Sequence, residues 1–302
     1  MNNSKKVLGT FSTPHEEELS SLNMEEKVVR ETLKSLKQAS LHSADAYWSS
    51  AFQRHKGFFT NYEQDKLRNA CVAIAGLGGV GGTVFIGLVR SGVGNFILAD
   101  YDVFELVNFN RQTGARPDTL GRKKMDVLIE EALRINPFIN IRKFPQGLNA
   151  SNIEEFLQGA SIVVDAMDFF AYNERLTLLL LCRKKNLFLV TSGNAGFGSS
   201  LLVFDPNGME LEKFLGVSLN SNQKDLMAAF ALAWIPRQLN SDYTDPCYVS
   251  LESKVAPATW VASALAGAMI VTEVLRRLGV VILGPSTTAS RFRASLNVYE
   301  IA

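Results

Sequence analysis

The sequence has few cysteines and almost no net charge. Its 302 residues include three cysteines, Cys71, Cys182 and Cys247, which lie far apart and form no Cys-x-x-Cys pair. This spacing supports neither a disulfide framework nor a zinc knuckle. The formal net charge of +1 predicts no strong overall attraction to nucleic acid or to an anionic membrane. We therefore expect a protein of the reducing cytoplasm.

Long hydrophobic runs are also scarce. The first twenty residues contain no apolar core of the kind that a signal peptide needs, which argues against secretion. The long uncharged stretch over residues 255–272 is rich in alanine and serine and contains Pro257. We interpret it as part of a buried helix over residues 257–278, and we expect no membrane partner.

Residues 1–50 have the pattern of a helical extension. Thr13, Pro14 and Glu16 combine an N-cap residue, a first-turn proline and a capping-box glutamate. Apolar residues then fall roughly on one stripe of the expected helix 14–37: Leu19, Leu22, Val29, Leu33 and Leu36. Such a stripe needs a surface to cover, either the main domain or a second subunit.

From Cys71 onward, apolar runs alternate with helical segments. We expect strands over residues 71–75, 95–99, 139–144, 161–167 and 187–193, and helices over 124–133, 151–157 and 172–185. This alternation predicts an α/β fold with a Rossmann-like, doubly wound, mostly parallel sheet. Residues 197–206 and 290–301 are expected to add antiparallel C-terminal strands, the last one at the edge.

The segment over residues 206–255 is expected to be irregular, with one aromatic-rich helix, and to face the substrate. Its aromatic and apolar residues predict either a groove for an extended peptide tail or ordinary core packing. These residues are Phe230, Trp234, Ile235 and Tyr243.

A glycine-rich turn lies between the first expected strand and the helix that follows it. Gly76, Gly78, Gly79 and Gly81 permit a tight turn in which backbone N–H groups and the helix N-terminus can approach phosphate. Asp100 closes the next strand, where a carboxylate can accept hydrogen bonds from ribose hydroxyls. These features alone are compatible with NAD, FAD or ATP.

Further polar groups favour a triphosphate. Residues 108–112 read Asn-Phe-Asn-Arg-Gln, Lys124 opens a helix, Asp168 follows a strand, and Arg54 precedes the core domain. The charges of ATP repel an incoming carboxylate and must be neutralised by arginine, lysine and Mg²⁺. Hydride transfer needs no such set. Any one of these residues could instead be a surface charge or, for Asp168, a helix cap.

This order of elements resembles the ThiF/MoeB/HesA family and the adenylation halves of ubiquitin-activating enzymes. The family pattern is a GxGGxG loop, an acidic residue ending the second strand, an N-x-x-R-Q motif, a lysine at a helix start and a later aspartate. The resemblance covers roughly residues 50–302. It implies an adenylation domain over residues 51–302 that uses ATP and Mg²⁺ to activate a carboxylate as acyl-AMP, with release of pyrophosphate.

The resemblance also implies residue roles. Asp100 would hold the ribose, Asn108 and Arg111 would contact the phosphates, Lys124 would neutralise them, and Asp168 would coordinate Mg²⁺. Arg54 would reach into the site of a partner subunit. The implied assembly is a homodimer.

The chain departs from the family at the presumed metal site. Family members often carry an asparagine directly after the metal-binding aspartate and an arginine one turn later, whereas Asp168 is followed by Phe169, and Asn173 and Arg175 come later. The details of the adenine pocket stay open for this reason. We interpret Asp165 as a structural carboxylate.

The carboxylate substrate is left open by the sequence. Candidates are the C-terminus of a ubiquitin-like or sulfur-carrier protein, a peptide, or a carboxylated nucleoside in transfer RNA. The Asn-Phe-Asn-Arg-Gln run resembles the branch that dehydrates threonylcarbamoyladenosine in tRNA, but no broad basic stripe accompanies it, so we rank RNA lower. Cys247 could form a thioester or persulfide after adenylation, although no neighbouring His or Lys activates it. An NAD- or FAD-dependent oxidoreductase and a non-catalytic nucleotide-binding scaffold are the rival classes.

Overall fold

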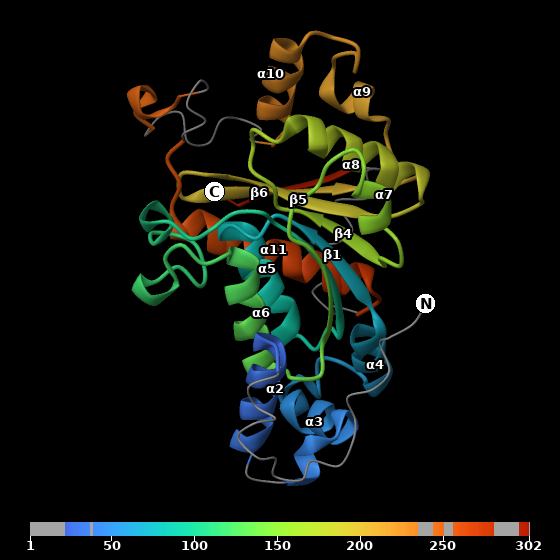
Figure 1. The fold of residues 1–302 in the computed structure, drawn as a ribbon. Helices are drawn as coiled ribbons and strands as arrows, with labels where there is room; N and C mark the ends of the chain where they lie inside the picture. The colour runs from blue at the N-terminus through green and yellow to red at the C-terminus, as the bar shows by residue number, and fades with distance from the viewer. Residues whose placement is uncertain (1–21, 37–38, 235–243, 251–255, 281–295, 302) are drawn as a thin grey trace.

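The chain forms a twisted seven-stranded sheet with helices on both faces (Figure 1). The structure is a computed structural model that describes residues 22–36, 39–234, 244–250, 256–280 and 296–301. The strands are β1 (Cys71–Ala75), β2 (Asn95–Ala99), β3 (Asn140–Phe144), β4 (Ile162–Asp165), β5 (Leu189–Ala195), β6 (Gly198–Phe204) and β7 (Leu296–Ile301). The helices of the sheet domain are α5 (Gly79–Arg90), α6 (Lys124–Ile135), α7 (Ile153–Phe156), α8 (Tyr172–Lys184), α9 (Leu211–Leu215), α10 (Gln223–Trp234) and α11 (Trp260–Arg277).

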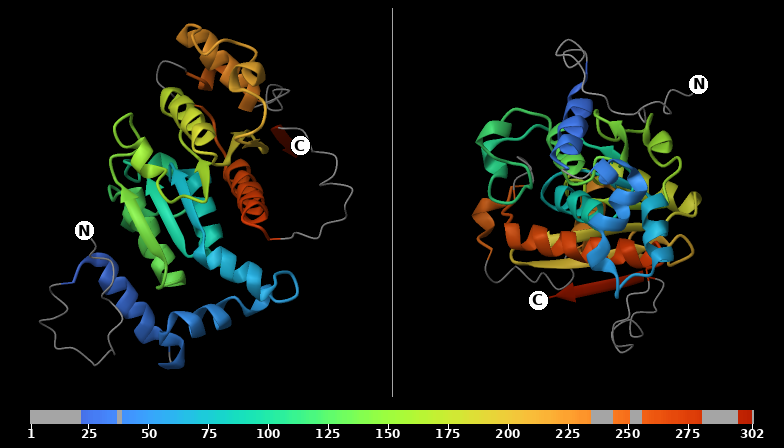
Figure 2. Two further views of the ribbon diagram at one scale, coloured as in Figure 1. Left: turned by 90° about the vertical axis from the view of Figure 1, so that its right-hand side faces the viewer. Right: turned by 90° about the horizontal axis from the view of Figure 1, so that it is seen from below.

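The strand order is β3-β2-β1-β4-β5-β6-β7. Strands β1 to β5 are parallel, whereas β6 and β7 pair antiparallel. The predicted fold class, including the antiparallel C-terminal strands, is therefore confirmed. Strand β7 forms the edge of the sheet, as the right-hand view of Figure 2 shows in red. Residues 292 and 294, assigned to the same strand from the sequence, lie outside the described part.

Two apolar clusters sandwich the sheet, because successive side chains of a strand point to opposite faces. Val72 and Ile74 of β1 join the cluster beneath α5, α6 and α11. Ala73 and Ala75 of the same strand join the cluster beneath α7, α8, α9 and α10. Strands β1 and β4 are apolar except at Cys71 and Asp165 because both of their faces are covered, which is the doubly wound arrangement.

The N-terminal extension packs on the same chain. Its helices are α2 (Met24–Ser35) and α3 (Ala44–Ala51), and α4 (Asn61–Asn69) follows before the first strand. Helix α2 begins after Asn23, whose side chain accepts a hydrogen bond from the N–H of Glu26 at 3.0 Å in a capping box. The start expected at residues 13–16 lies outside the described part. Of the predicted apolar stripe, Leu33 is buried and Val29 is half-buried, while Val28, which was not assigned to the stripe, is also buried; α2 packs against α6. The main domain therefore supplies a surface for this stripe.

Trp48 of α3 connects the extension to the sheet domain. Its indole N–H donates to the carbonyl of Gly92 at 3.2 Å, and Trp48 and Phe52 belong to the same apolar cluster as β1 and α5. The division of the chain at residue 50 stays a prediction.

The segment predicted to be irregular is more ordered than expected, since it contains α9 and α10. Phe230 and Trp234 are 1% and 3% exposed, and Trp234 stacks on Phe204. These two aromatic residues therefore belong to the core, and they do not line a peptide groove. Ile235 and Tyr243 lie outside the described residues. No helix in the described part of the chain is long and apolar enough to cross a membrane.

Candidate nucleotide site

The register of the parallel strands places the site at their carboxyl ends. Ala75 of β1 lies opposite Ala99 of β2 and Asp165 of β4. The residues that follow these three strands therefore meet at one edge of the sheet. They are Gly76 after β1, Asp100 after β2 and the loop from residue 166 after β4. Ligands of open α/β sheets bind at this edge, where the strand order changes direction. Here the change falls at β1, from which β2 and β4 extend on opposite sides.

Close packing of the backbone requires glycine at two positions of this turn. Gly76 has a φ of +88°, and a Cβ there would lie 2.4 Å from the carbonyl oxygen of Ala166. A Cβ on Gly81 would lie 1.9 Å from the carbonyl oxygen of Gly76. Gly78 caps α5 without a side-chain hydrogen bond from any described residue. The first N–H groups of α5 thus lack a capping side chain, which suits them to bind an anion.

Asp100 joins the second strand to the glycine turn. Its Oδ2 accepts a hydrogen bond from the N–H of Leu77 at 2.6 Å, and its Oδ1 accepts one from the N–H of Asp102 at 2.8 Å. Burial raises the pKa of Asp100, while these two hydrogen bonds and the charge of Lys124 lower it less strongly. The carboxylate lies where the resemblance requires a ribose acceptor, and it also braces the turn.

Lys124 is already paired in the structure. Its ammonium group donates to Oδ2 of Asp102 at 2.9 Å, and its backbone N–H donates to the carbonyl of Asp102 at 3.0 Å. The side chain is 7% exposed, whereas that of Asp102 is 49% exposed. Asp102 is a residue that the sequence analysis missed. The D-x-D pattern of residues 100–102 is a signal that could have pointed to it.

Arg111 lies on the loop beside the glycine turn, where its carbonyl oxygen would be 3.4 Å from a Cβ on Gly79, and its charge interacts with that of Asp168 on another loop. Burial lowers the pKa of Arg111, and the nearby charge of Asp168 opposes this shift. The guanidinium donates to the carbonyl of Val107 at 3.0 Å and to Oδ1 of Asn110 at 2.9 Å. Asn108 is buried, and its Oδ1 accepts a hydrogen bond from the N–H of Glu105 at 2.9 Å. Asn108 therefore shapes the loop, with its amide nitrogen left for a ligand.

A buried ion pair shapes the loop that carries Asp168. Arg175 Nε donates to Oδ2 of Asp165 at 2.6 Å, with the two side chains 4% and 0% exposed. The same guanidinium donates to the carbonyl of Met167 at 2.8 Å and to that of Phe169 at 3.3 Å. Asp165 is thus a structural carboxylate, as predicted. Arg175 holds the turn that presents Asp168 to solvent.

The acidic groups are compatible with Mg²⁺ only in the company of phosphates. Among the described residues, no group of three or more His, Cys, Asp and Glu could hold a metal ion. Asp168 is exposed, and its Oδ1 accepts a hydrogen bond from the N–H of Phe170 at 2.9 Å. Its other oxygen can therefore bind a cation. Magnesium is commonly held by one or two carboxylates together with substrate phosphates, so one available carboxylate suits it.

Arg54 does not reach this site within its own chain. It is exposed in a short 3₁₀ turn, Gln53–His55. The neighbouring Phe52 packs against Gly92, just beyond the C-terminal end of α5, whereas the glycine turn precedes the N-terminal end. The 12 residues of α5 span about 18 Å. A role for Arg54 in the site of a partner subunit stays a prediction.

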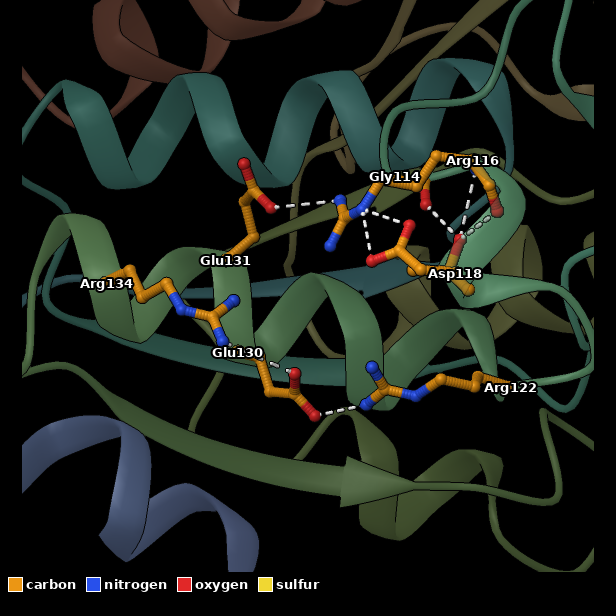
Figure 3. A network of polar contacts seen from close by, with 8 residues as sticks. Gly114, Arg116, Asp118, Arg122, Glu130, Glu131 and Arg134 are labelled. Carbon is orange, nitrogen blue, oxygen red and sulfur yellow. Dashed lines mark hydrogen bonds and ion pairs between the residues drawn. The ribbon is translucent and has the colours of Figure 1, made fainter. Parts of the chain in front are cut away.

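The loop before α6 carries arginines that are paired with carboxylates (Figure 3). Arg122 contacts Glu130, whose side chain is 7% exposed. Arg116 lies 2.9 Å from Asp118 and 3.6 Å from Glu131. This network fixes the loop that ends at α6, and it neutralises two of the loop's positive charges.

None of the three cysteines shows activation in the structure. Cys247 is exposed, and its hydrogen bond with Asp245 raises the pKa of its thiol. Cys182 is buried, and burial raises the pKa of its thiol. Cys71 is partly exposed rather than fully buried, and burial again raises its pKa.

A doubly wound sheet with an uncapped glycine turn at its strand-order change defines the Rossmann-like class of nucleotide-binding folds. The profile of the ThiF family matches residues 52–300. The chain therefore belongs to the ThiF family.

Curated relatives differ in what their names say they act on. The chain is 32% identical over 148 residues to the tRNA threonylcarbamoyladenosine dehydratase of Haemophilus influenzae, covering 48% of this chain and 56% of that protein. It is 32% identical over 143 residues to the sulfur carrier protein ThiS adenylyltransferase of Escherichia coli, covering 47% and 56%. The chain thus spans about half the length of the curated relatives it matches.

Solved structures share the fold. E. coli tRNA N6-threonylcarbamoyladenosine dehydratase, TcdA, matches with a TM-score of 0.56 at 22% identity, covering 81% of this chain and 98% of that one. E. coli MccB matches with a TM-score of 0.57 at 24% identity, covering 76% and 64%. Because tRNA-modifying relatives stand beside carrier-protein relatives, the lower rank that the sequence analysis assigned to RNA is not supported.

Proposed function

We propose that this chain is an ATP-dependent adenylyltransferase that activates a carboxylate as acyl-AMP and releases pyrophosphate. The observation that carries the proposal is the meeting of three groups at one edge of the sheet. These are the uncapped N-terminus of α5, the loop of Arg111, whose carbonyl oxygen would lie 3.4 Å from a Cβ on Gly79, and the loop after β4, which contacts Gly76 and carries the exposed Asp168. A hydride-transfer site would need the first of them and neither of the others.

Each residue of the site has its own role in the proposed adenylation. In this mechanism a carboxylate oxygen of the substrate attacks the α-phosphorus of ATP, and the bond to the pyrophosphate oxygen breaks. The N–H groups of α5 and the Arg111 guanidinium stabilise the charge that spreads over the phosphates. Asp100 accepts the ribose hydroxyls, and the Nδ2 of Asn108 contacts a phosphate. Asp168 would hold Mg²⁺, which supplies further neutralisation of the phosphates when it is bound.

The ammonium group of Lys124 is paired with Asp102, so it has to leave this partner in order to contact a phosphate. The ion pair holds the buried ammonium group in place before the nucleotide arrives. A triphosphate near this pair would draw the ammonium group toward itself, and the half-exposed Asp102 could then be solvated. In this proposal the positive charge of Lys124 stabilises the phosphates of the bound nucleotide, and the ion pair with Asp102 places the ammonium group nearby in advance.

The first candidate substrate is a carboxylated nucleoside of tRNA. Two observations support it: the resemblance of the Asn108–Gln112 motif, and the tRNA threonylcarbamoyladenosine dehydratases among the relatives. Arg116 and Arg122 of the loop before α6 are each paired with a carboxylate, so an RNA contact at this loop would find these two charges already neutralised.

The second candidate is the C-terminal carboxylate of a small carrier protein or peptide. A mostly apolar pocket of about 430 Å³ lies beside the start of α11. It is lined by Gly196, Phe197, Thr244, Asp245, Tyr248, Ala256, Pro257 and Thr259. Asn110 of the phosphate loop donates a hydrogen bond to the carbonyl of Ala258 at 2.8 Å. The pocket therefore adjoins the loop that carries Arg111, where an extended tail could end at the nucleotide.

The deciding experiment is ATP–pyrophosphate exchange, measured with bulk tRNA, with tRNA bearing threonylcarbamoyladenosine, and with small carrier proteins. Exchange that requires the modified tRNA supports the first candidate, and exchange that requires a carrier supports the second. Calorimetric titration with ATP and Mg²⁺, NAD and FAD tests the class itself. Tight binding of NAD or FAD with no binding of ATP would overturn the proposed function.

A further inference from the structure

Helices α5 and α11 approach each other closely along a seam of small residues. Three positions of α5 spaced by four residues face three positions of α11 with the same spacing. A Cβ on Gly79 would lie 2.8 Å from Oγ of Ser263, and a Cβ on Gly87 would lie 2.9 Å from Val271. Between them, a Cβ on Gly267 would lie 2.5 Å from Thr83. The seam therefore brings the first turn of α11 against the glycine turn.

Ser263 lies in this seam, and its hydroxyl makes no hydrogen bond to any described residue. The residue is 1% exposed. A serine inside a helix can donate to the carbonyl four residues earlier, but the Oγ of Ser263 does not. The position of a Cβ on Gly79 is nearer to the Oγ of Ser263, at 2.8 Å, than to its Cβ, at 3.3 Å. The hydroxyl thus faces the start of α5.

A second unpartnered atom belongs to a side chain near the same turn. The Oε1 of Gln112 is buried and has no partner among the described residues. A Cβ on Gly78 would lie 3.8 Å from Nε2 of this side chain. Buried polar atoms are rarely left without a partner unless a ligand or water supplies one. Two such atoms beside an uncapped helix N-terminus point to a polar group bound there.

We propose that the Ser263 hydroxyl donates a hydrogen bond to a phosphate oxygen of the nucleotide bound at the N-terminus of α5. A hydroxyl suits this position because it can donate to an anion without adding a charge that would have to be buried in the free protein. The inference deepens the proposed function and rests on it, since it requires a nucleotide at the glycine turn. It adds a residue from α11, an element that the sequence analysis did not connect with the site.

The test compares Ser263→Ala with wild type in two measurements. Calorimetric titrations with ATP and with adenosine should show about tenfold weaker binding of ATP by the variant, because hydrogen bonds to charged groups contribute at least this much. Binding of adenosine, which has no phosphate, should be unchanged. The thermal unfolding midpoint without nucleotide should stay equal or rise, because the variant removes an unpaired buried hydroxyl. Thr272→Ala is the matched control: it removes a hydroxyl from the exposed face of α11 and should change neither titration.

Two results would overturn the inference. One is Ser263→Ala binding ATP as tightly as wild type does. The other is an equal loss for ATP and adenosine together with a lower unfolding midpoint, which would make Ser263 a packing residue. If wild type itself binds no nucleotide, the proposed function fails first, and that outcome is separate from any effect of Ser263.

Discussion

At the scale of single residues, the polar groups around the glycine turn are held in place by second residues. Asp100 is held by two backbone N–H groups, Lys124 by Asp102, and the loop of Asp168 by Arg175. Preorganised groups of this kind stabilise developing charge without having to reorient during the reaction. The consequence is that a change of charge and a change of position can be separated by mutation.

Asp168→Asn tests the charge alone. An asparagine can keep the Oδ1 acceptor that caps the N–H of Phe170, so the loop should stay folded. We expect roughly a hundredfold slower adenylation, about 3 kcal/mol, because the anchoring charge for the metal is lost. Pyrophosphate release in a single turnover measures this rate.

Cys247→Ala serves as the control for that measurement. Its thiol is exposed, and it could act only after the acyl-AMP exists, so the first pyrophosphate burst should be unchanged. Full activity of Asp168→Asn would make Asp168 a loop cap, and a lost burst in Cys247→Ala would refute the two-stage order.

Asp100 should leave a signature in the pH dependence of stability. Burial raises the pKa of this carboxyl above its usual value of 3.8. Between the two values the folded protein keeps a proton that the unfolded chain has released. The stability that Asp100 contributes is therefore complete below 3.8 and is lost as pH rises through the raised pKa.

Urea unfolding of wild type and Asp100→Asn between about pH 4 and 7 measures this contribution. We expect the free energy of unfolding of wild type, relative to the variant, to decrease as the pH rises. The comparison removes the effect of all other titrating groups, which the two proteins share. A relative free energy that increases with pH would contradict the assigned direction of the pKa shift.

At the scale of elements, the contact of α5 with α11 decides the shape of the site. Glycine inside a helix usually lowers stability, and replacing it by alanine usually adds about 0.5–1 kcal/mol. Gly267 should behave in the opposite way, because its new Cβ would lie 2.5 Å from Thr83. We expect Gly267→Ala to lower the free energy of unfolding by about 1–3 kcal/mol, as overpacking does. Denaturant unfolding gives the value.

Ala268→Gly provides the comparison on the exposed face of α11. It should cost only the ordinary helix propensity, about 0.5–1 kcal/mol. If Gly267→Ala stabilises the protein, the helices can separate freely, and the close seam that positions Ser263 would not exist in solution.

At the scale of the whole molecule, the position of Arg54 raises the question of assembly. The residue lies beyond the far end of α5 from the glycine turn, so a role in catalysis needs a second copy of the chain. We predict a homodimer in which each site receives Arg54 from its partner. Light scattering should give twice the monomer mass of 33.2 kDa.

Mixing two inactive variants tests the exchange of Arg54 directly. Arg54→Ala and Asp168→Asn should each be nearly inactive alone. A mixed dimer would contain one site with both residues intact, so unfolding and refolding an equal mixture should restore about a quarter of wild-type activity. An active monomer, or a mixture that stays inactive, would remove the support for Arg54 acting across an interface.

The sequence by itself determined the sheet, the glycine turn and the order of the polar motifs. Apolar runs such as β1 and β4 predict buried parallel strands because both faces of such a strand are covered. The positions of Gly76 and Gly81 were evident because tight turns leave no room for a side chain. These properties are local, and a local pattern expresses them directly. The helix start expected at residues 13–16 lies outside the described residues and stays a prediction.

Only the tertiary structure decided which residues support one another. The pairing of Lys124 with Asp102, the buried pair of Arg175 with Asp165 and the approach of Ser263 to Gly79 join segments that are separate in the chain. The aromatic residues of α10 likewise pack in the core, where the sequence left a groove equally open. Such contacts depend on how helices and strands dock, and docking is set by packing across elements, which the pattern within any one element does not contain.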